Sequence, residues 1–391
     1  MIKSKRILAL GVIAALGFTA AACGSDDEGS ESTDAPADSA APADSGAPAD
    51  SAAPADSTEP VESGAPADST ATSDEPAGST PAGDCSVGVV YDITGRGDKS
   101  FNDAAGAGLD KAVDELGVVG AESTPTGDGD RAERVTGLVD DGNGLVVGVG
   151  FLFGDSITAA SAAAPDTSFA IIDSVVEADN VASLVFAEEQ GSFLVGAAAA
   201  LKSQTDTIGF IGGVENELIQ RFEAGYAAGA QAVNPDIEIL TNYISQPPDF
   251  TGFNDPAKGK ELAAAQYEAG ADVVYSAAGG SGLGAFEAAA AAGEPGTVWA
   301  IGVDSDQYEL VSPELQPYIL TSMLKKVDVA TYDTIEAFCN GTFEGGVQVF
   351  DIASGGIDYS TSGGFVDDIA TELDAFKEQI ASGEIEVPTA P

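Results

Sequence analysis

The segment Tyr91–Asp103 gathers side chains that could recognise a small polar molecule. It is a glycine-containing turn that ends on an aromatic residue and an amide, Phe101 and Asn102. Phe101 can offer a flat apolar face to a heterocycle, Asn102 can donate and accept hydrogen bonds along its edge, and Asp92 can accept from ligand N–H groups. The alternative is an ordinary helix start, in which Ser100 is the N-cap and Phe101 enters the core.

The chain contains no histidine, the commonest general base and a frequent metal ligand in enzymes. Its absence excludes Ser-His-Asp triads and histidine-dependent zinc hydrolase motifs. Gly127–Asp130 lacks the remaining oxygen ligands of a calcium loop, and Gly280–Gly284 lacks the full spacing of a dinucleotide-binding turn. We therefore expect no catalytic residue, no metal and no cofactor, although a carboxylate-pair or lysine mechanism stays formally open.

The first 23 residues have the pattern of an export signal. Three basic residues within Met1–Arg6 precede an apolar run over Ile7–Ala22, which is shorter than the roughly 20 residues that cross a bilayer. Small residues stand directly before Cys23, as in lipoprotein signal peptides, whose cysteine is acylated. We expect residues 1–23 to be a lipoprotein signal peptide and Cys23 to carry a two-chain anchor. Ala20 stands where such signals usually have leucine, so a released form is the alternative.

Residues 24–84 repeat Ala-Pro-Ala-Asp-Ser with variations and contain almost no large apolar side chain. A segment of this composition cannot bury enough apolar surface to offset the entropy lost on ordering. Its prolines favour extended backbone and its acids repel one another. We therefore expect a disordered tether that holds the folded part away from the membrane, on the extracytoplasmic face.

The whole chain is strongly acidic, with 15 Lys and Arg against 64 Asp and Glu and a net charge of −49 at pH 7. Such a charge repels the phosphate backbone of nucleic acids, so nucleic acid is excluded as a partner.

From Ser86 onward, short Val, Ile and Leu runs alternate with Ala-rich amphipathic stretches, which is typical of an α/β fold with buried parallel sheets. The region is longer than one hydrophobic core normally serves, so we expect two lobes facing each other across a cleft. Ligands of such sheets bind beyond the carboxyl ends of the strands. The expected strands are Val87–Tyr91, Gly144–Gly150, Phe169–Asp173, Val181–Phe186, Thr207–Ile211, Glu238–Tyr243, Val273–Ser276, Trp299–Val303 and Ile319–Ser322.

The loop that ends at Asp103 is similar to the opening motif of the basic membrane protein family, which includes purine nucleoside receptors of ABC importers. The resemblance implies a type I periplasmic-binding-protein fold, with two doubly wound parallel-sheet lobes joined by a hinge. We expect lobe 1 to span about 85–187 plus 304–345, and lobe 2 about 188–303 plus 346–375. The similarity continues in family order through Pro165–Asp173, Ile208–Gly213, Phe222–Tyr226, Gly270–Val273, Ile301–Gln307 and Thr321–Lys325.

The resemblance also nominates residues for the base of a nucleoside. Nucleoside-binding members of the family clamp the purine between two aromatic rings. By the matching motifs, Phe101 would stack on one face and Phe253 on the other, with Asn102 and Asp92 reading the edge of the base. Phe250 lies three residues before Phe253 and is the alternative second ring.

For the sugar, the matching motifs nominate Asp304 and Lys325. A carboxylate accepts protons from a vicinal diol, while an ammonium donates to ribose oxygens and balances the buried acid. Gly279 and Gly280 would let the backbone approach the ligand. Asp173 belongs either to the pocket or to the hinge. The plainer alternatives are a strand-end turn for Asp304 and a solvated helix charge for Lys325.

If Cys23 is acylated, Cys85 and Cys339 remain in an oxidising compartment, where an even pair tends to bridge. We predict a Cys85–Cys339 disulfide; two free thiols are the alternative, because the sequence does not give their separation.

Together these features predict a monomeric, lipid-anchored substrate-binding protein on the outer face of the cell membrane. It would bind a purine nucleoside or a similar small polar ligand and present it to the permease subunits of an ABC importer. A surface receptor or sensor with a non-nucleoside ligand is the alternative. A nucleoside-cleaving enzyme is the least favoured reading, and we expect no enzymatic activity.

Overall fold

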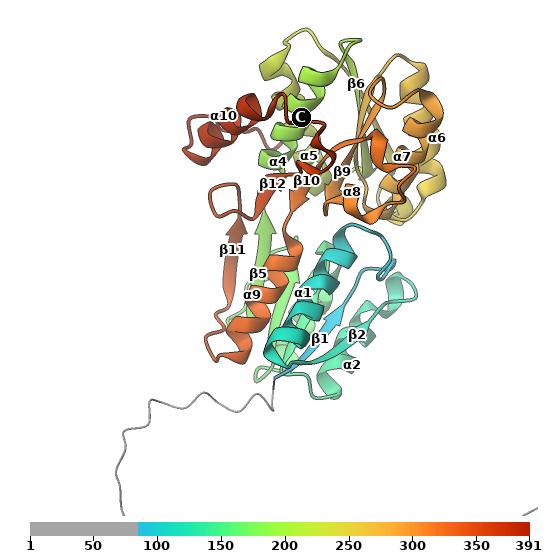
Figure 1. Ribbon diagram of the computed structural model, residues 1–391. Coiled ribbons are helices and arrows are strands. Elements are labelled where there is room, and N and C mark those ends of the chain that lie inside the picture. The colour runs from blue at the N-terminus through green and yellow to red at the C-terminus, as the bar shows by residue number, and fades with distance from the viewer. Residues whose placement is uncertain (1–84) are drawn as a thin grey trace, which may run out of the picture. The chain divides into compact units, whose positions relative to one another are not determined.

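The computed structural model describes residues 85–391 (Figure 1). The predicted signal peptide, its Cys23 and the predicted tether over 24–84 lie outside the described residues. Within the described part, no helix is both long enough and apolar enough to span a bilayer.

The first lobe contains a six-stranded, wholly parallel sheet with the strand order β11-β5-β4-β3-β1-β2. Alternate residues of β1 point to opposite faces, so Val89 packs in one core cluster with Leu109 and Val90 in another with Val135. The helices around this sheet are α1 (Phe101–Leu116), α2 (Arg131–Asp140), α3 (Gly154–Ala163) and α9 (Val327–Cys339). Its strands are β1 (Ser86–Val90), β2 (Val119–Ser123), β3 (Leu145–Gly148), β4 (Ser168–Ile172), β5 (Val181–Phe186) and β11 (Gly346–Phe350).

The second lobe contains another six-stranded sheet, ordered β12-β10-β9-β8-β6-β7, in which only β12 runs antiparallel. Its strands are β6 (Thr207–Val214), β7 (Glu238–Ser245), β8 (Val273–Ala277), β9 (Trp299–Asp304), β10 (Ile319–Lys325) and β12 (Ile357–Tyr359). Its helices are α4 (Glu188–Lys202), α5 (Glu217–Val233), α6 (Pro256–Glu268), α7 (Gly282–Ala292), α8 (Gln307–Leu310) and α10 (Ala370–Ala381). The two sheets confirm the predicted α/β class.

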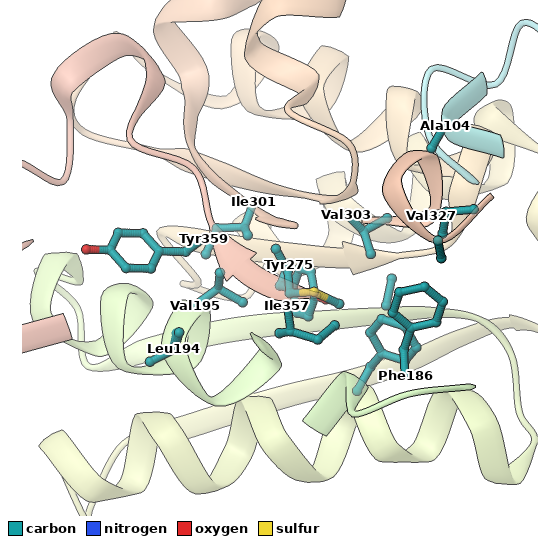
Figure 2. Close-up of a cluster of buried hydrophobic side chains, with 14 of the residues drawn as sticks. Ala104, Phe186, Leu194, Val195, Tyr275, Ile301, Val303, Val327, Ile357 and Tyr359 are labelled. Carbon is teal, nitrogen blue, oxygen red and sulfur yellow. The ribbon is translucent and has the colours of Figure 1, made fainter. Parts of the chain in front are cut away.

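Helices α4 and α5 cross with their backbones in direct contact. A Cβ atom at Gly229 would lie 1.9 Å from the carbonyl oxygen of Phe193, so only glycine fits at this crossing. Figure 2 shows Leu194 and Val195 of α4 in the buried cluster that also contains Ile357 of β12. These contacts fix α4, and with it the start of that helix, to the second lobe.

The chain passes between the lobes three times: after β5, after β10 and after β11. After β10 it returns to the first lobe, where α9 packs beside α1 (Figure 1). The predicted lobe boundaries are wrong for two strands. β10, inside the expected 304–345 segment of lobe 1, pairs with β9 in the second sheet, and β11, inside the expected 346–375 segment of lobe 2, pairs with β5 in the first. The lobe to which β10 or β11 belongs is set by the strand it pairs with, and not by its position in the chain.

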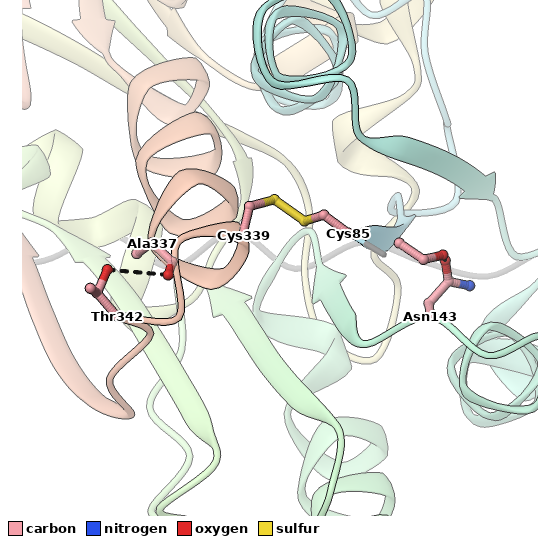
Figure 3. The surroundings of a disulfide bond; sticks show 6 residues. Cys85, Asn143, Ala337, Cys339 and Thr342 are labelled. Atoms are coloured by element: carbon pink, nitrogen blue, oxygen red, sulfur yellow. Dashed lines mark hydrogen bonds between the residues drawn. A yellow bond between two sulfur atoms is a disulfide. The ribbon is translucent and has the colours of Figure 1, made fainter. Parts of the chain in front are cut away.

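Cys85, directly before β1, and Cys339, the last residue of α9, form a disulfide (Figure 3), which confirms the predicted pairing. Their Cα atoms are 5.4 Å apart, an ordinary separation for a bridged pair. The alternative of two free thiols is therefore wrong. The bond fastens the returning helix α9 to the first strand of the first lobe.

Candidate functional site

A cavity lies beyond the carboxyl ends of strands from both sheets, where the sequence places the ligand loops. Its first-lobe wall comes from the loops after β1, β3 and β4 and the start of α1. Its second-lobe wall comes from α5, the loops after β7 and β8, and the ends of β9 and β10. The lining residues are Asp92, Ile93, Thr94, Asp98, Phe101, Asn102, Arg131, Gly150, Phe151, Leu152, Asp173, Leu218, Ile219, Phe222, Pro248, Asp249, Phe250, Thr251, Phe253, Ala277, Gly279, Val303, Asp304 and Lys325.

The loop before α1 is held by the carboxylate of Asp98, which is 7% exposed. Asp98 accepts hydrogen bonds from the backbone N–H groups of Ser100, Asn102 and Asp103 at 2.9 to 3.1 Å. Burial raises the pKa of Asp98, although these three N–H groups oppose the shift. Ser100 is the N-cap residue of α1, as the alternative interpretation had it, but its side chain makes no capping hydrogen bond and Asp98 accepts from the first N–H groups in its place. The Ser100 hydroxyl instead donates to Asp304 Oδ2 at 2.5 Å, across the two lobes.

Asn102 lines the cavity, but both N–H groups of its side chain are used within its own loop. They donate to Thr94 Oγ1 at 2.6 Å and to Asp98 Oδ2 at 3.1 Å, while Oδ1 accepts from the backbone N–H of Asp92. The amide therefore shapes the loop, and Oδ1 keeps one acceptor lone pair.

Asp92 lies beside Arg131, a cavity residue that sequence reasoning missed. The Arg131 guanidinium donates to Asp92 Oδ1 at 3.0 Å, and the side chain of Arg131 is only 8% exposed. The pair places an acceptor and a cation together in the cavity wall. A lone arginine at a helix start, in a chain with 15 basic residues, offered no spacing signal that would single it out.

Five phenylalanines supply aromatic surface to the cavity: Phe101 and Phe151 from the first lobe, Phe222 of α5, and both Phe250 and Phe253 after β7. The Phe151 ring meets Phe250 and Phe253 edge-on, with centroids 5.9 and 6.4 Å apart. The Phe253 ring packs closely against Gly213 of β6. A Cβ atom at this glycine would lie 2.5 Å from the ring. Both predicted candidates therefore reach the cavity, and Phe151 joins them.

Lys325 also lines the cavity and is 2% exposed. Its Nζ is 2.6 Å from Asp173 Oδ2 and 3.4 Å from Glu188 Oε1, and Asp304 approaches the same group. The Phe101 ring centroid is 5.0 Å from Nζ, so the predicted stacking ring also contacts the ammonium. Lys325 ends a strand and is buried, so the alternative of a solvated helix charge is wrong.

Two carboxylates of this cluster, Asp304 and Glu188, have raised pKa values. Burial raises the pKa of Asp304 to about 6, although Lys325 and the Ser100 hydroxyl oppose the shift. Burial raises the pKa of Glu188 to about 7, opposed by Lys325. Burial alone would lower the pKa of Lys325, but the carboxylates around it outweigh that effect and raise it. The cluster therefore keeps a firmly charged ammonium among acids that are costly to ionise together.

Asp173 and Asp304 end equivalent strands of the two lobes, and both have a backbone φ of +65°. Non-glycine residues adopt this left-handed conformation uncommonly, and it often marks functional turns. Gly279, with a φ of +54°, also lines the cavity, whereas Gly280 is buried beside it and does not. Asp173 thus belongs to the pocket and pairs with Lys325. Within residues 85–391 we find no group of three or more Cys, Asp or Glu side chains arranged to hold a metal ion.

Two parallel-sheet lobes around a cavity lined by both define a solute-binding protein of the periplasmic-binding-protein type. The sequence model of the family described as "ABC transporter substrate-binding protein PnrA-like" matches residues 85–390. The chain belongs to this family, which is also that of the basic membrane proteins.

Two curated relatives support the assignment. The ABC transporter nucleoside-binding protein BmpA of Lactococcus lactis subsp. cremoris is 35% identical over 323 residues, which cover 78% of this chain and 90% of that protein. Basic membrane protein A of Borreliella burgdorferi is 33% identical over 301 residues, covering 75% and 84%.

Solved structures agree on the fold. An ABC transporter solute-binding protein from Aeropyrum pernix K1 superposes with a TM-score of 0.69 and 30% identity, covering 78% of this chain and 93% of that one. A protein from Bacillus halodurans, titled a transcriptional activator of the comK gene, superposes with a TM-score of 0.63 and 26% identity, covering 77% and 99%.

Proposed function

We propose that this ABC transporter substrate-binding protein takes a purine nucleoside, and that it works as a lipid-anchored monomer on the outer face of the cell membrane. The observation that carries the proposal is the layout of the cavity. The cavity combines aromatic rings with two separate sets of polar groups, the Asp92–Arg131 pair and the group formed by Asp173, Asp304 and Lys325. A nucleoside has matching parts: a polar base edge, a flat ring system and a polyhydroxylated sugar.

In this proposal the base stacks between Phe101 and a ring of the second lobe, Phe253 or Phe250. Its polar edge meets Asp92, and the free lone pair of Asn102 adds a second acceptor. Each aromatic stack contributes about 0.5 to 1.5 kcal/mol. These contributions, with charge-assisted hydrogen bonds of about 1.5 to 3 kcal/mol each, are enough for micromolar affinity once the costs of association are met.

The sugar lies against Asp304 and Lys325. The Asp304 carboxylate accepts from the ribose hydroxyls, and the Lys325 ammonium, held by Asp173, donates to the sugar oxygens. The Asp304 side chain is 8% exposed and accepts only from Ser100 among the hydrogen bonds of the described residues, so its carboxylate has acceptor capacity left.

Hydrogen bonds between the lobes support a closing mechanism. Besides the bond from Ser100 to Asp304, Gln307 Nε2 donates to the carbonyl oxygen of Lys99 at 2.9 Å, and the Ser305 hydroxyl donates to the carbonyl oxygen of Ser100 at 3.2 Å. These bonds form only when the loop before α1 meets the end of β9. A ligand that touches both walls would favour this arrangement, which the permease then recognises.

Two observations favour binding over catalysis. The sequence has no histidine, and the cavity acids Asp92 and Asp173 are each paired with a cation, as expected for fixed recognition groups.

The signal-like residues before Cys23 support acylation, and with it membrane anchoring over release. Replacing Cys23→Ser should move the protein from the membrane fraction to the soluble fraction, and unchanged fractionation would contradict the anchor.

The sugar assignment is tested with Asp304→Asn. We expect this change to weaken the binding of inosine at least tenfold and to have a much smaller effect on 2′,3′-dideoxyinosine, which lacks the two hydroxyls. Asp306→Asn, which changes a nearby carboxylate that does not line the cavity, is the matched control. Equal losses for both ligands, or none, would refute the role of Asp304.

A further inference from the structure

Glu188 is a buried acid that neither sequence motifs nor the cavity lining single out. It is the first residue of α4, its side chain is 1% exposed, and it does not line the cavity. Its Oε1 lies 3.4 Å from Lys325 Nζ. Its Oε2 accepts no hydrogen bond within the described part of the chain, and the Arg221 guanidinium is 4.0 Å away. Glu188 therefore contacts the ligand-side lysine from behind the cavity wall.

Glu188 and Lys325 lie on two different crossings between the lobes. Glu188 follows β5, where the chain first enters the second lobe, and Lys325 ends β10, where the chain returns to the first. The third crossing is tied to the first, because the Ile352 N–H donates to Gln190 Oε1 at 3.0 Å. The Glu188–Lys325 ion pair thus links two hinge segments directly beside the cavity.

The ammonium of Lys325 has three N–H donors. Asp173 Oδ2 accepts from one of them at 2.6 Å, and Glu188 Oε1 forms an ion pair with the ammonium at 3.4 Å. The rings of Phe186 and Phe222, with centroids 5.0 and 5.7 Å from Nζ, close other directions. Asp173 lines the cavity and Glu188 does not, so the ammonium is held between a cavity acid and an acid behind the cavity wall. Without Glu188, only the cavity acids Asp173 and Asp304 would act on the ammonium, and its direction would be less defined.

We propose that Glu188 is a positioning residue for ligand binding, which aims Lys325 at the sugar and makes the affinity fall as the pH rises through neutrality. This inference rests on the proposed nucleoside site. Its physical basis is a charge imbalance, because one ammonium faces three carboxylates in a volume from which closure excludes water. The ionisable groups that face Glu188 are Lys325 of β10, Asp173 after β4, Asp304 of β9, Glu189 of α4, Arg221 of α5 and Tyr275 of β8.

The direction of the pH effect follows from linkage. Burial raises the pKa of Glu188 to about 7 when the lobes are together. When the lobes part at the hinge, water reaches the carboxylate and its pKa falls toward the ordinary value. Closure then takes up a proton between these two values, so ligand binding is strongest at low pH and weakens as the pH rises through about 7. One group of this kind changes the affinity by at most about tenfold per pH unit.

The test measures the dissociation constant of inosine from pH 6.5 to 8.5, above the pKa of Asp304. Glu188→Gln keeps an oxygen that can accept from Lys325 but removes the charge. Glu189→Gln is the matched control, since it neutralises the neighbouring buried acid, which forms no ion pair with Lys325 among the described contacts. We expect inosine binding to weaken at least threefold across this range in the wild type and in Glu189→Gln, and to stay within twofold in Glu188→Gln.

A second variant separates positioning from folding. Glu188→Ala should weaken inosine at least tenfold while leaving the binding of hypoxanthine, which has no sugar, nearly unchanged. A third measurement needs no variant. Calorimetric titration of the wild type with inosine at pH 7, in buffers of different ionisation enthalpy, should show that protons are taken up on binding.

Three outcomes would overturn the inference. They are a pH profile of Glu188→Gln that parallels the wild type, equal losses of inosine and hypoxanthine in Glu188→Ala, or no proton uptake on binding. A wild-type protein that binds no nucleoside would overturn the proposed function and this inference with it, whereas nucleoside binding with any of the three outcomes above would overturn the inference alone.

Discussion

Replacing Lys325→Met removes the only cation within ion-pair distance of Asp173, and the nearest cation to Glu188, in the described part of the chain. Methionine nearly preserves the volume and the unbranched shape, so packing against Phe101 and Phe186 is retained. What changes is the charge, since acids that are 6% and 1% exposed lose their counter-ion.

The cost follows from burial. Breaking a buried ion pair by removing one partner typically costs about 3 to 5 kcal/mol, because the remaining charge is left uncompensated. Lys325 opposes the raised pKa of Glu188, so its loss raises this folded-state pKa further above the value in the unfolded chain. A raised carboxylate pKa leaves stability intact below the unfolded value, near pH 4, and costs stability as the pH rises through the folded value. The loss in the free energy of unfolding should therefore be larger at pH 8 than at pH 5.

Urea unfolding followed by the fluorescence of Trp299 measures this loss. Trp299 is the single tryptophan of the chain, lies in β9 and is 7% exposed. Lys202→Met is the matched control, because it breaks an ion pair with the exposed Asp368, which is worth at most about 1 kcal/mol. Wild-type stability of Lys325→Met at pH 8, or a loss that does not change between pH 5 and pH 8, would refute the reasoning.

Three further changes test other parts of the structure. Phe253→Ala should weaken inosine about tenfold and Phe250→Ala less, as measured by calorimetric titration; the reverse order would make Phe250 the second stacking ring. Joint replacement of Cys85 and Cys339 by serine should lower the free energy of unfolding by up to about 5 kcal/mol, because the bridge closes a loop across 254 residues, and a loss under 1 kcal/mol would contradict this. Gly229→Ala should cost about 1 to 3 kcal/mol in urea unfolding, because the methyl group would meet the backbone of α4; an unchanged midpoint would contradict the close crossing.

The sequence predicted the eight interior strands of the two sheets and one edge strand, β7, which is only partly buried. The nine expected runs correspond to β1 and β3 to β10 in order, and the interior ones are recognisable because a parallel strand covered by helices is apolar throughout. The three missed strands lie at sheet edges. β2 reads Val-Gly-Ala-Glu-Ser and is mostly exposed, β11 is exposed along most of its length, and β12 has three residues. These three edge strands carry no continuous apolar signal, so composition alone could not reveal them.

The lobe boundaries failed for a different reason. β10 and β11 lie close together in the chain but belong to different sheets. Their pairing partners, β9 and β5, are chosen by contacts that a single sequence does not display. The hinge crossings therefore became visible only in the structure.

The candidate site likewise contains residues that the sequence could nominate and residues that only the structure could reveal. Sequence could nominate Asp92, Phe101, Asp304 and Lys325, because each lies at or just after the end of a strand or at the start of a helix within a recognisable motif. Phe151 could have been found by the same rule, because it directly follows the strand expected to end at Gly150. Glu188 could not. An acid at the start of a helix is usually a solvated N-terminal charge, and only its contact with Lys325, far along the chain, explains its burial.

The measurement that tests the central claim most directly is calorimetric titration of the purified protein, stripped of co-purified ligand by unfolding and refolding, with inosine, guanosine, adenosine, uridine and ribose. The account predicts saturable binding of purine nucleosides with micromolar or tighter affinity, and weaker binding of ribose, which lacks the base that the phenylalanines stack on. No binding of any purine nucleoside by the refolded protein would contradict it.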